Sequence, residues 1–393
     1  MARPRLMKPP ASEEEFLAYS KIAETAFATP RKESLEYFER TGHDTIRLYH
    51  DRGELAGGLV ILPMAQWFGG RAVPMGGIAA VAVDPQFRDR GVAGGMMAAA
   101  VREMYQRGQV LSTLYPATLP LYRRAGYELA GTIHEIKLPP RDLVERERKL
   151  TMEEITPEAF PEIQRAYRLY ARQHNGPLDR IRYFWQRVQK PFGMPPTRGY
   201  AIRRGRKLEG YVYAVTKPQD QGYQLLRIFD YAVLTPAAMR RLLTFIADHR
   251  TLCESAIWYG TPSDPLLLVM AEHTYRIRLL GQWMLRIVDL AGALEARGYP
   301  RGVKGRVQLR VRDEILRANN GAFVLEVEGG RARVRPGGKG SVKLHIRSLA
   351  PLYSGHMTPE VLAAAGQLEA TPRQMATLTS IFAGPAPWMA DLF

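Results

Sequence analysis

A glycine-rich turn between a buried strand and a helix carries the clearest chemical signal in this sequence. Its residues, 81–95, read Val-Ala-Val-Asp-Pro-Gln-Phe-Arg-Asp-Arg-Gly-Val-Ala-Gly-Gly. The small residues Gly91, Ala93, Gly94 and Gly95 let a ligand approach the backbone closely. The first amide groups of a helix have no intrahelical acceptor, and the positive end of the helix dipole favours an anion there. With Arg88 and Arg90 adding positive charge, the turn predicts a site for a pyrophosphate.

The turn matches one phosphate-binding pattern and departs from two others. A Walker loop would continue with Gly-Lys-Ser or Gly-Lys-Thr, and a dinucleotide fingerprint needs Gly-x-Gly-x-x-Gly; neither pattern is present in the turn. The turn does contain Arg-x-x-Gly-x-Ala, at Arg88, Gly91 and Ala93. In this pattern it resembles the GCN5-related N-acetyltransferases, which hold the pyrophosphate of acetyl-CoA with that motif. The alternative is a helix start that is rich in glycine and binds no ligand.

A tyrosine-containing stretch after this turn offers a candidate general acid. Acetyl transfer from a thioester leaves a thiolate, and a tyrosine hydroxyl, with a pKa of about 10, is suited to protonate it. Acetyltransferases of this superfamily carry a similar Tyr-x-x-x-Gly-Tyr/Phe stretch, which corresponds here to Tyr122, Gly126 and Tyr127. The resemblance assigns Tyr122 to the sulfur of the cofactor, whereas the alternative is a packing aromatic. Tyr127 is predicted to be a core residue.

The glycine-rich turn and the tyrosine are expected to be positioned by a mixed sheet with helices packed against it. Hydrophobic patterning predicts helices at 14–28, 34–40, 92–107 and 119–125, and strands at 45–50, 57–65, 75–83, 110–114 and 127–137. Mixed order of this kind indicates a single α/β sheet covered by helices. In the superfamily the strand that ends in Val81–Val83 bulges, pairs with the pantetheine arm and aims an amide at the thioester carbonyl, where it would stabilise the developing oxyanion.

The rest of the chain divides into two further segments. Pro139–Arg141 and the charged run to Lys149 read as a linker. Residues 201–216 then repeat the strand–turn–strand pattern, followed by a strand at 226–234 and a helix at 237–249 that Thr235-Pro236 caps. The last segment predicts an α+β domain with helices at 290–297, 358–365 and 371–382 and strands at 305–312, 322–328, 331–335 and 341–346. We predict domains at 1–141, 142–288 and 289–393.

This three-part layout resembles one family within the superfamily, the enhanced intracellular survival (Eis-type) N-acetyltransferases. Members have an active N-terminal acetyltransferase domain, a central acetyltransferase-like domain without the cofactor motif, and a C-terminal domain like a sterol carrier protein. The fold class implied is therefore α/β and α+β, with tandem acetyltransferase folds. The central repeat fits, because no Arg-x-x-Gly-x-Ala/Gly follows Thr235-Pro236. The resemblance also implies a homo-hexamer.

The same resemblance implies roles for individual residues. Tyr122 becomes the general acid toward the CoA thiolate. In the family the carboxylate of a final phenylalanine accepts the substrate proton, and the matching residue is Phe393. The apolar ending Trp388–Phe393 supports a docked terminus, because frayed tails are usually polar. The cofactor contacts carried over, together with Arg88 of the motif, are Val81, Ala82, Val83, Asp89, Arg90, Gly91, Val92, Ala93, Gly94, Ala117 and Thr118.

Composition narrows the class of protein. The 393 residues are 46% hydrophobic and 24% charged, as in globular proteins, and the single cysteine, Cys253, excludes an internal disulfide framework. We expect Cys253 and the methionines of the helix after the turn to be core residues. No apolar run reaches the length of a membrane span, and no signal peptide precedes Glu13, so we expect a cytoplasmic protein that does not contact a membrane. None of the eight histidines shows metal-ligand spacing, so we expect no metal.

The leading prediction is direct acetylation of a primary amine by acetyl-CoA. The amine is left open between a polyamine-like molecule, an aminoglycoside, and a lysine or N-terminus of a peptide. A net charge of +16 opposes a polycationic substrate at long range, although Glu13–Glu15, Glu24 and Asp391 offer local acidic groups. Two alternatives are a lipid or sterol carrier built on 289–393 and a nucleic-acid-associated protein. We do not expect nucleic acid, because the densest basic cluster, Arg203–Lys207, reads as a solvated hairpin turn.

Overall fold

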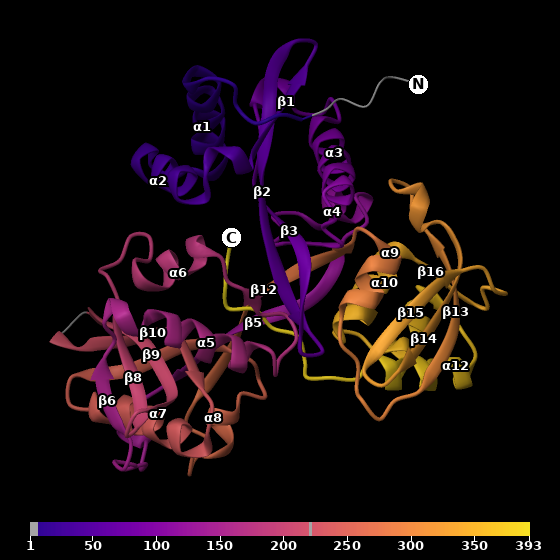
Figure 1. Ribbon diagram of the computed structural model, residues 1–393. Helices are drawn as coiled ribbons and strands as arrows, with labels where there is room; N and C mark the ends of the chain where they lie inside the picture. Colours follow the sequence, from indigo (N-terminus) through magenta and orange to yellow (C-terminus); the bar gives the residue numbers. More distant parts are fainter. Residues whose placement is uncertain (1–6, 220–221) are drawn as a thin grey trace. The chain divides into compact units, whose positions relative to one another are not determined.

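The computed structural model describes residues 7–219 and 222–393, which divide into two units. The first unit takes in the described residues up to Gly131 together with Gln282–Pro387 and Leu392–Phe393, and the second unit takes in Thr132–Gly281 and Trp388–Asp391. Of the helices in these residues, none combines the length and apolar character that crossing a bilayer requires. Figure 1 labels most of the helices and strands of both units.

The first unit contains a mixed sheet in the order β1-β2-β3-β4-β12, and Figure 1 shows β2 and β3 as its long hairpin. Strands β1, β2 and β3 are antiparallel, β4 is parallel to β3, and the end of β12 is antiparallel to β4. The strands are β1 Ile46–Asp51, β2 Glu54–Phe68, β3 Arg71–Val83, β4 Leu111–Leu114 and β12 Arg276–Ile287. The helices are α1 Glu13–Phe27, α2 Arg31–Thr41, α3 Val92–Gln106 and α4 Leu119–Arg124.

Helix α3 packs on this sheet through a stripe of apolar side chains. Met96, Met97, Ala100, Val101 and Met104 are fully buried, at the three- and four-residue spacing that places side chains on one face of a helix. The prediction that these methionines belong to the core is confirmed. Their burial fixes the axis of α3, and so the direction in which its N-terminus points.

Strand β3 is irregular at the position that matters for chemistry. Its register with β2 shifts between Gly58 and Val60, and Ala80 has a φ of 49°. An extra residue of this kind bends a strand and re-aims its backbone groups. The parallel pairing of β3 with β4 runs from Met75 to Gly77 only. Beyond that point the two strands share no ladder, which leaves their backbone groups available to another partner.

The second unit repeats this plan without the glycine turn. Its sheet has the order β5-β11-β10-β9-β8-β6, in which β10 and β11 are parallel. The strands are β5 Glu128–Leu138, of which residues 128–131 belong to the first unit, β6 Thr151–Glu154, β8 Arg198–Arg204, β9 Lys207–Pro218, β10 Gln224–Val233 and β11 Cys253–Gly260, with a short β7 at Leu178–Asp179. The helices are α5 Phe160–Ala171, α6 Arg182–Gln189, α7 Pro236–Asp248 and α8 Pro265–Leu268. The predicted cap is confirmed, because Thr235 accepts a hydrogen bond from Ala238 N in front of α7.

Two further predictions in the second unit are confirmed. The basic cluster forms the turn between β8 and β9, where Arg203 pairs with Glu162 and Arg204 pairs with Glu209. These ion pairs remove part of the charge that a nucleic-acid patch would need. Cys253 is buried, and burial raises the pKa of its thiol, as expected for a core residue that does not react.

The C-terminal part of the first unit has a five-stranded sheet in the order β15-β14-β13-β16-β17. The strands are β13 Gly305–Arg312, β14 Gly321–Glu328, β15 Arg331–Pro336, β16 Val342–His345 and β17 Leu368–Glu369. The helices are α9 Leu290–Ala296, α10 Ile346–Ser354, α11 Pro359–Ala364 and α12 Pro372–Ile381. Along β13 buried and exposed residues alternate, as in a sheet with one covered face. Helix α10 was not predicted, because Pro351 inside it is a helix breaker in local terms.

Candidate active site

The glycine turn forms a concave run of backbone amides in front of α3. Asp84 accepts a hydrogen bond from Gln86 N at 2.9 Å and so starts a short 3₁₀ turn, Pro85–Phe87. Asp89 and Gly91 both have positive φ, 62° and 75°. Alternation of this kind turns successive N–H groups toward a common point, which makes an anion-binding concavity. Strand β3, this short turn and helix α3 therefore follow one another in the order that the sequence predicts, and the pyrophosphate site itself stays a prediction.

The amides at the start of α3 are accessible to a ligand. The first backbone hydrogen bond of the helix runs from Gly95 N to Gly91 O at 3.0 Å, so the amides of Val92, Ala93 and Gly94 precede the intrahelical ladder. A Cβ built on Gly91 or on Gly94 would meet no described atom within 4 Å. The residues present therefore fit a pyrophosphate.

Gly95 has a different role from its neighbours. A Cβ at this position would lie 2.5 Å from the hydroxyl oxygen of Tyr49 on β1. Gly95 therefore lets the helix pack closely against the sheet, while Gly91 and Gly94 face open space.

Tyr122 is held in place by the turn that ends α4. Its carbonyl accepts hydrogen bonds from Ala125 N and Tyr127 N, at 2.9 and 3.1 Å. The next residue, Arg123, binds the carboxylate of Glu128 on β5 through two nitrogens, at 3.0 and 2.7 Å. These contacts join α4 to the sheet and fix the direction of the Tyr122 ring, which packs edge-on against Tyr127.

The surroundings of Tyr122 keep its hydroxyl protonated. The side chain is buried, and burial raises the pKa of its hydroxyl above the ordinary value of 10. The hydroxyl therefore stays protonated throughout the neutral range. Tyr127 is fully buried with its hydroxyl bonded to Ser112, so the prediction that it belongs to the core is confirmed.

The strand segment Val81–Val83 follows the bulge of β3. Ala82 and Val83 pair with Gly58 and Gly57 of β2, which leaves the other edge of this segment outside the short ladder with β4. The carbonyl of the bulged residue, Ala80, accepts a short hydrogen bond from the buried hydroxyl of Tyr19 on α1. This contact fixes the bulge from one side.

The chain's last residue lies where β3 and β4 stop pairing. The Phe393 ring meets the Tyr115 ring edge-on, with centroids 6.1 Å apart, and Tyr115 directly follows β4. On β3, a Cβ added to Gly77 would come within 2.8 Å of Phe393 Cε2. The structure thus brings Phe393 next to the strands that carry the site.

Sequence reasoning missed Gly77 and Tyr115 as neighbours of Phe393. A signal for Gly77 was present, since a glycine inside a strand often marks a close approach by another part of the chain. Tyr115 had no such signal. Ala117 and Thr118 lie in the exposed loop after it, and Thr118 makes no side-chain capping bond to α4.

The sequence offered two other kinds of candidate, metal ligands and the acidic group of Asp391. No set of three or more histidine, cysteine or carboxylate residues within 7–219 and 222–393 is arranged to hold a metal ion. Asp391, considered above as an open acidic group, is paired with Arg180 and buried. It therefore does not offer a free charge to a cationic substrate.

Comparison with known proteins agrees with the fold. Models of the acetyltransferase (GNAT) domain match residues 9–130 and 176–287, and a sterol carrier protein domain model matches 290–390. The crystal structure of a GCN5-related N-acetyltransferase from Anabaena variabilis is 36% identical with a TM-score of 0.94, and covers 98% of this chain and 99% of that chain. The N-acetyltransferase Eis of Mycobacterium tuberculosis is 28% identical over 344 residues, 80% of this chain and 79% of the relative.

A more distant structure shares the fold alone. Eis1 from Mycobacterium abscessus is 20% identical with a TM-score of 0.82, and covers 98% of this chain and 100% of that chain. Fold and site together define an acyltransferase built from two acetyltransferase folds and a domain like sterol carrier proteins. The chain belongs to the GCN5-related N-acetyltransferases, and among them it is similar to Eis at 28% identity.

Proposed function

We propose that this enzyme transfers the acetyl group of acetyl-CoA directly to a primary amine. The observation that carries the proposal is the open space at Gly91 and Gly94, where α3 begins, in the same unit as the protonated hydroxyl of Tyr122. When bound, acetyl-CoA supplies the acetyl group as a thioester. The amides at the start of α3, with Arg88 and Arg90 beside them, would hold its pyrophosphate. Val81, Ala82, Val83, Asp89, Ala117 and Thr118 would line the rest of its path.

Each reacting group of the chain has one task in this scheme. A backbone amide of Val81–Val83 would donate to the thioester oxygen as negative charge develops on it. Tyr122 would give its proton to the departing sulfur, and the raised pKa of its hydroxyl keeps that proton in place until the thiolate forms. The terminal carboxylate of Phe393 would accept the proton that the amine loses. No acyl-enzyme is needed.

The other expectations remain proposals. We place the domains at 1–141, 142–288 and 289–393, and infer a cytoplasmic homo-hexamer that uses no metal. The substrate is a small-molecule amine, an aminoglycoside or a peptide amine. A lipid-carrier role for 289–393 gains no support from the two grooves recorded on that segment, because arginine, lysine and glutamate side chains dominate their walls.

A thiol-release assay with acetyl-CoA tests the proposal. The untagged protein is offered a panel of amines that contains a polyamine, an aminoglycoside and a lysine peptide, beside the Tyr122→Phe variant. We expect amine-dependent release of CoA by the natural chain and a loss of at least 100-fold in the variant. Release that does not depend on any amine, or that Tyr122→Phe leaves unchanged, would contradict the proposed mechanism.

A further inference from the structure

The second unit keeps the strand divergence of an acetyltransferase fold although it lacks the cofactor motif. The parallel pairing of β10 with β11 ends at Arg227 and Ile257, as that of β3 with β4 ends at Gly77 and Thr113 in the first unit. Strand β10 also has a register shift next to this point, between Ile228 and Asp230. The divergence therefore lies where the first unit has its proposed thioester site.

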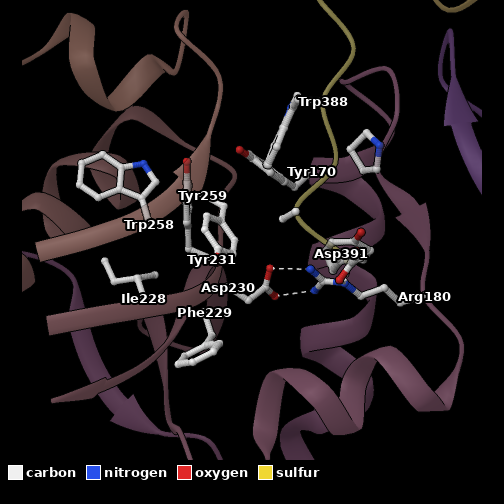
Figure 2. A pocket seen from close by; sticks show the side chains of 13 residues that line it. Tyr170, Arg180, Ile228, Phe229, Asp230, Tyr231, Trp258, Tyr259, Trp388 and Asp391 are labelled. Carbon is white, nitrogen blue, oxygen red and sulfur yellow. Dashed lines mark hydrogen bonds and ion pairs between the residues drawn. The ribbon is translucent and has the colours of Figure 1, made fainter. Parts of the chain in front are cut away.

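This divergence is filled by the chain's own end. Trp388, Ala390 and Asp391 line the same pocket as Ile228–Tyr231 of β10 and Trp258-Tyr259 of β11 (Figure 2). The cavity that remains is about 20 Å³, which is room for one water and not for a thioester arm. The divergence of β10 and β11 is thus occupied by a peptide from the end of the chain.

Backbone contacts fix the first half of that peptide. Trp388 N donates to Asn175 O at 3.0 Å, and Met389 N donates to Thr132 O at 3.2 Å. Met389 is fully buried, and the Trp388 ring packs edge-on against the His174 ring. These contacts fix the register of Trp388 and Met389, because a slip of one residue would turn the buried Met389 side chain to the other face, but they do not position the residues that follow.

A buried ion pair positions the residues that follow Met389. Arg180 Nε lies 3.0 Å from both carboxylate oxygens of Asp391, while its two terminal nitrogens bind Asp230 at 2.7 and 2.9 Å. The side chains of Arg180, Asp230 and Asp391 are 2%, 6% and 9% exposed. Figure 2 shows Arg180 between the two carboxylates. A slip of one residue would leave this part of the cluster without Asp391 and would bury an unmatched group, which is costly.

The guanidinium of Arg180 is held in place by its other neighbours and cannot move with the end of the chain. Its carbon lies 4.1 Å from the centre of the Tyr167 ring and 5.1 Å from that of Trp185. The hydroxyl of Tyr211 donates to Asp230 at 2.6 Å and holds the second carboxylate. Arg180 is therefore a fixed reference point against which the position of Asp391 is set.

We propose that the divergence of β10 and β11 is a peptide-binding site for Trp388–Asp391, in which Arg180 is the positioning residue for the end of the chain. The catalytic part of this inference rests on the proposed function of Phe393. Only Leu392 separates Asp391 from Phe393, so the Cα atoms of Asp391 and Phe393 are at most about 7 Å apart. A slip of one residue would move the terminal carboxylate by about 3.5 Å, and misplacement by about 1 Å is enough to cost a catalyst about 100-fold.

The anchoring is measured without any acetyl transfer. The full-length chain is treated with a carboxypeptidase, and removal of Phe393 and Leu392 is followed by intact mass spectrometry. We expect Asp391→Asn and Arg180→Gln to be trimmed at least tenfold faster than the natural chain. Asp391→Asn leaves the Arg180–Asp230 pair whole and is the variant expected to keep its fold. Arg148→Gln, which breaks an exposed bidentate pair with Asp248 in the same unit, is the control and should be trimmed at the natural rate.

Kinetics then separate positioning from general damage. We expect Asp391→Asn to lower kcat at least tenfold while KM for acetyl-CoA changes less than twofold, and the double variant Arg180→Lys with Asp391→Glu to recover part of both kcat and protection. A rate of carboxypeptidase trimming that is unchanged in Asp391→Asn and Arg180→Gln would contradict the proposal that Arg180 anchors Asp391. Faster trimming with an unchanged kcat would support the anchor and contradict the proposed base role of Phe393.

Discussion

The ring of Phe393 lies against the backbone of Gly77, close enough that a Cβ at residue 77 would be 2.8 Å from Phe393 Cε2. The last residue of the chain therefore depends on a missing side chain in the middle of β3. A Cβ at residue 77 would also collide with the side chain of Met64 on β2, so moving the Phe393 ring alone would not make room for it. This relationship places the terminus beside the strands that carry the proposed chemistry.

Replacing Gly77 tests whether that position matters. We expect Gly77→Ala to lower kcat about tenfold because the Phe393 ring must move, while acetyl-CoA still binds at the start of α3. Steady-state kinetics and calorimetric titration with CoA measure the two effects. Gly302→Ala is the control, since a Cβ there meets nothing within 4 Å. Equal kcat in the two variants would argue against a role for the docked ring.

Two neighbouring glycines of α3 should respond in opposite ways. Gly94→Val would fill the open space at the cradle, so we expect KM for acetyl-CoA to rise at least tenfold with a melting temperature close to that of the natural chain. Gly95→Ala would instead meet the Tyr49 hydroxyl and lower stability by about 1–3 kcal/mol. Thermal unfolding and acetyl-CoA saturation curves distinguish them. A destabilised Gly94→Val with unchanged KM would show that the cradle binds no cofactor.

The pH profile reports the state of Tyr122. Burial raises the pKa of its hydroxyl above 10, so the acid remains protonated at and above neutral pH. We expect no alkaline loss of kcat from this group below about pH 10, and a fall only beyond it. Stopped-assay rates between pH 6 and pH 10 measure this. A descending limb centred near pH 8 in the natural chain that disappears in Tyr122→Phe would contradict the assignment.

The terminal carboxylate of Phe393 is expected to be essential. A short extension after Phe393, or its deletion, should abolish turnover because the carboxylate is moved or lost. Affinity for CoA should stay nearly the same, because the cradle at Gly91 and Gly94 is untouched. Thiol release and CoA titration on untagged, C-terminally extended and shortened chains make the comparison. Full activity in the extended chain would refute the base role.

His174 should make the stability of the protein depend on pH. Burial lowers its pKa from 6.5 to about 4, so the unfolded chain binds a proton at pH 5 that the folded chain does not. Folding stability from this group is present above pH 6.5 and is lost as the pH falls toward 4. Between pH 7 and pH 5 we expect a loss of about 2 kcal/mol. Urea unfolding of the natural chain and of His174→Gln measures it, and an identical pH dependence in both would exclude His174 as the cause.

The sequence by itself determined the local parts of this enzyme. The turn before α3, the cap of α7 and the hairpin at Arg204–Lys207 follow from contacts between residues close in the chain, so pattern and spacing were sufficient. Helix α10 was not predicted from the sequence. Its buried packing stabilises it despite Pro351, and no local rule describes that packing.

Tertiary structure decided the parts that join distant residues. Pairing of Met284–Ile287 with Leu111–Leu114 and the ion pair of Arg180 with Asp391 link positions that are 170 or more residues apart along the chain. The sequence indicated that the last six residues were docked, and named Phe393 only through family resemblance. That Asp391 is bound by Arg180 and that Phe393 lies against Gly77 could not be read from it, because such partners are selected by the packing of the whole sheet and not by their spacing in the chain.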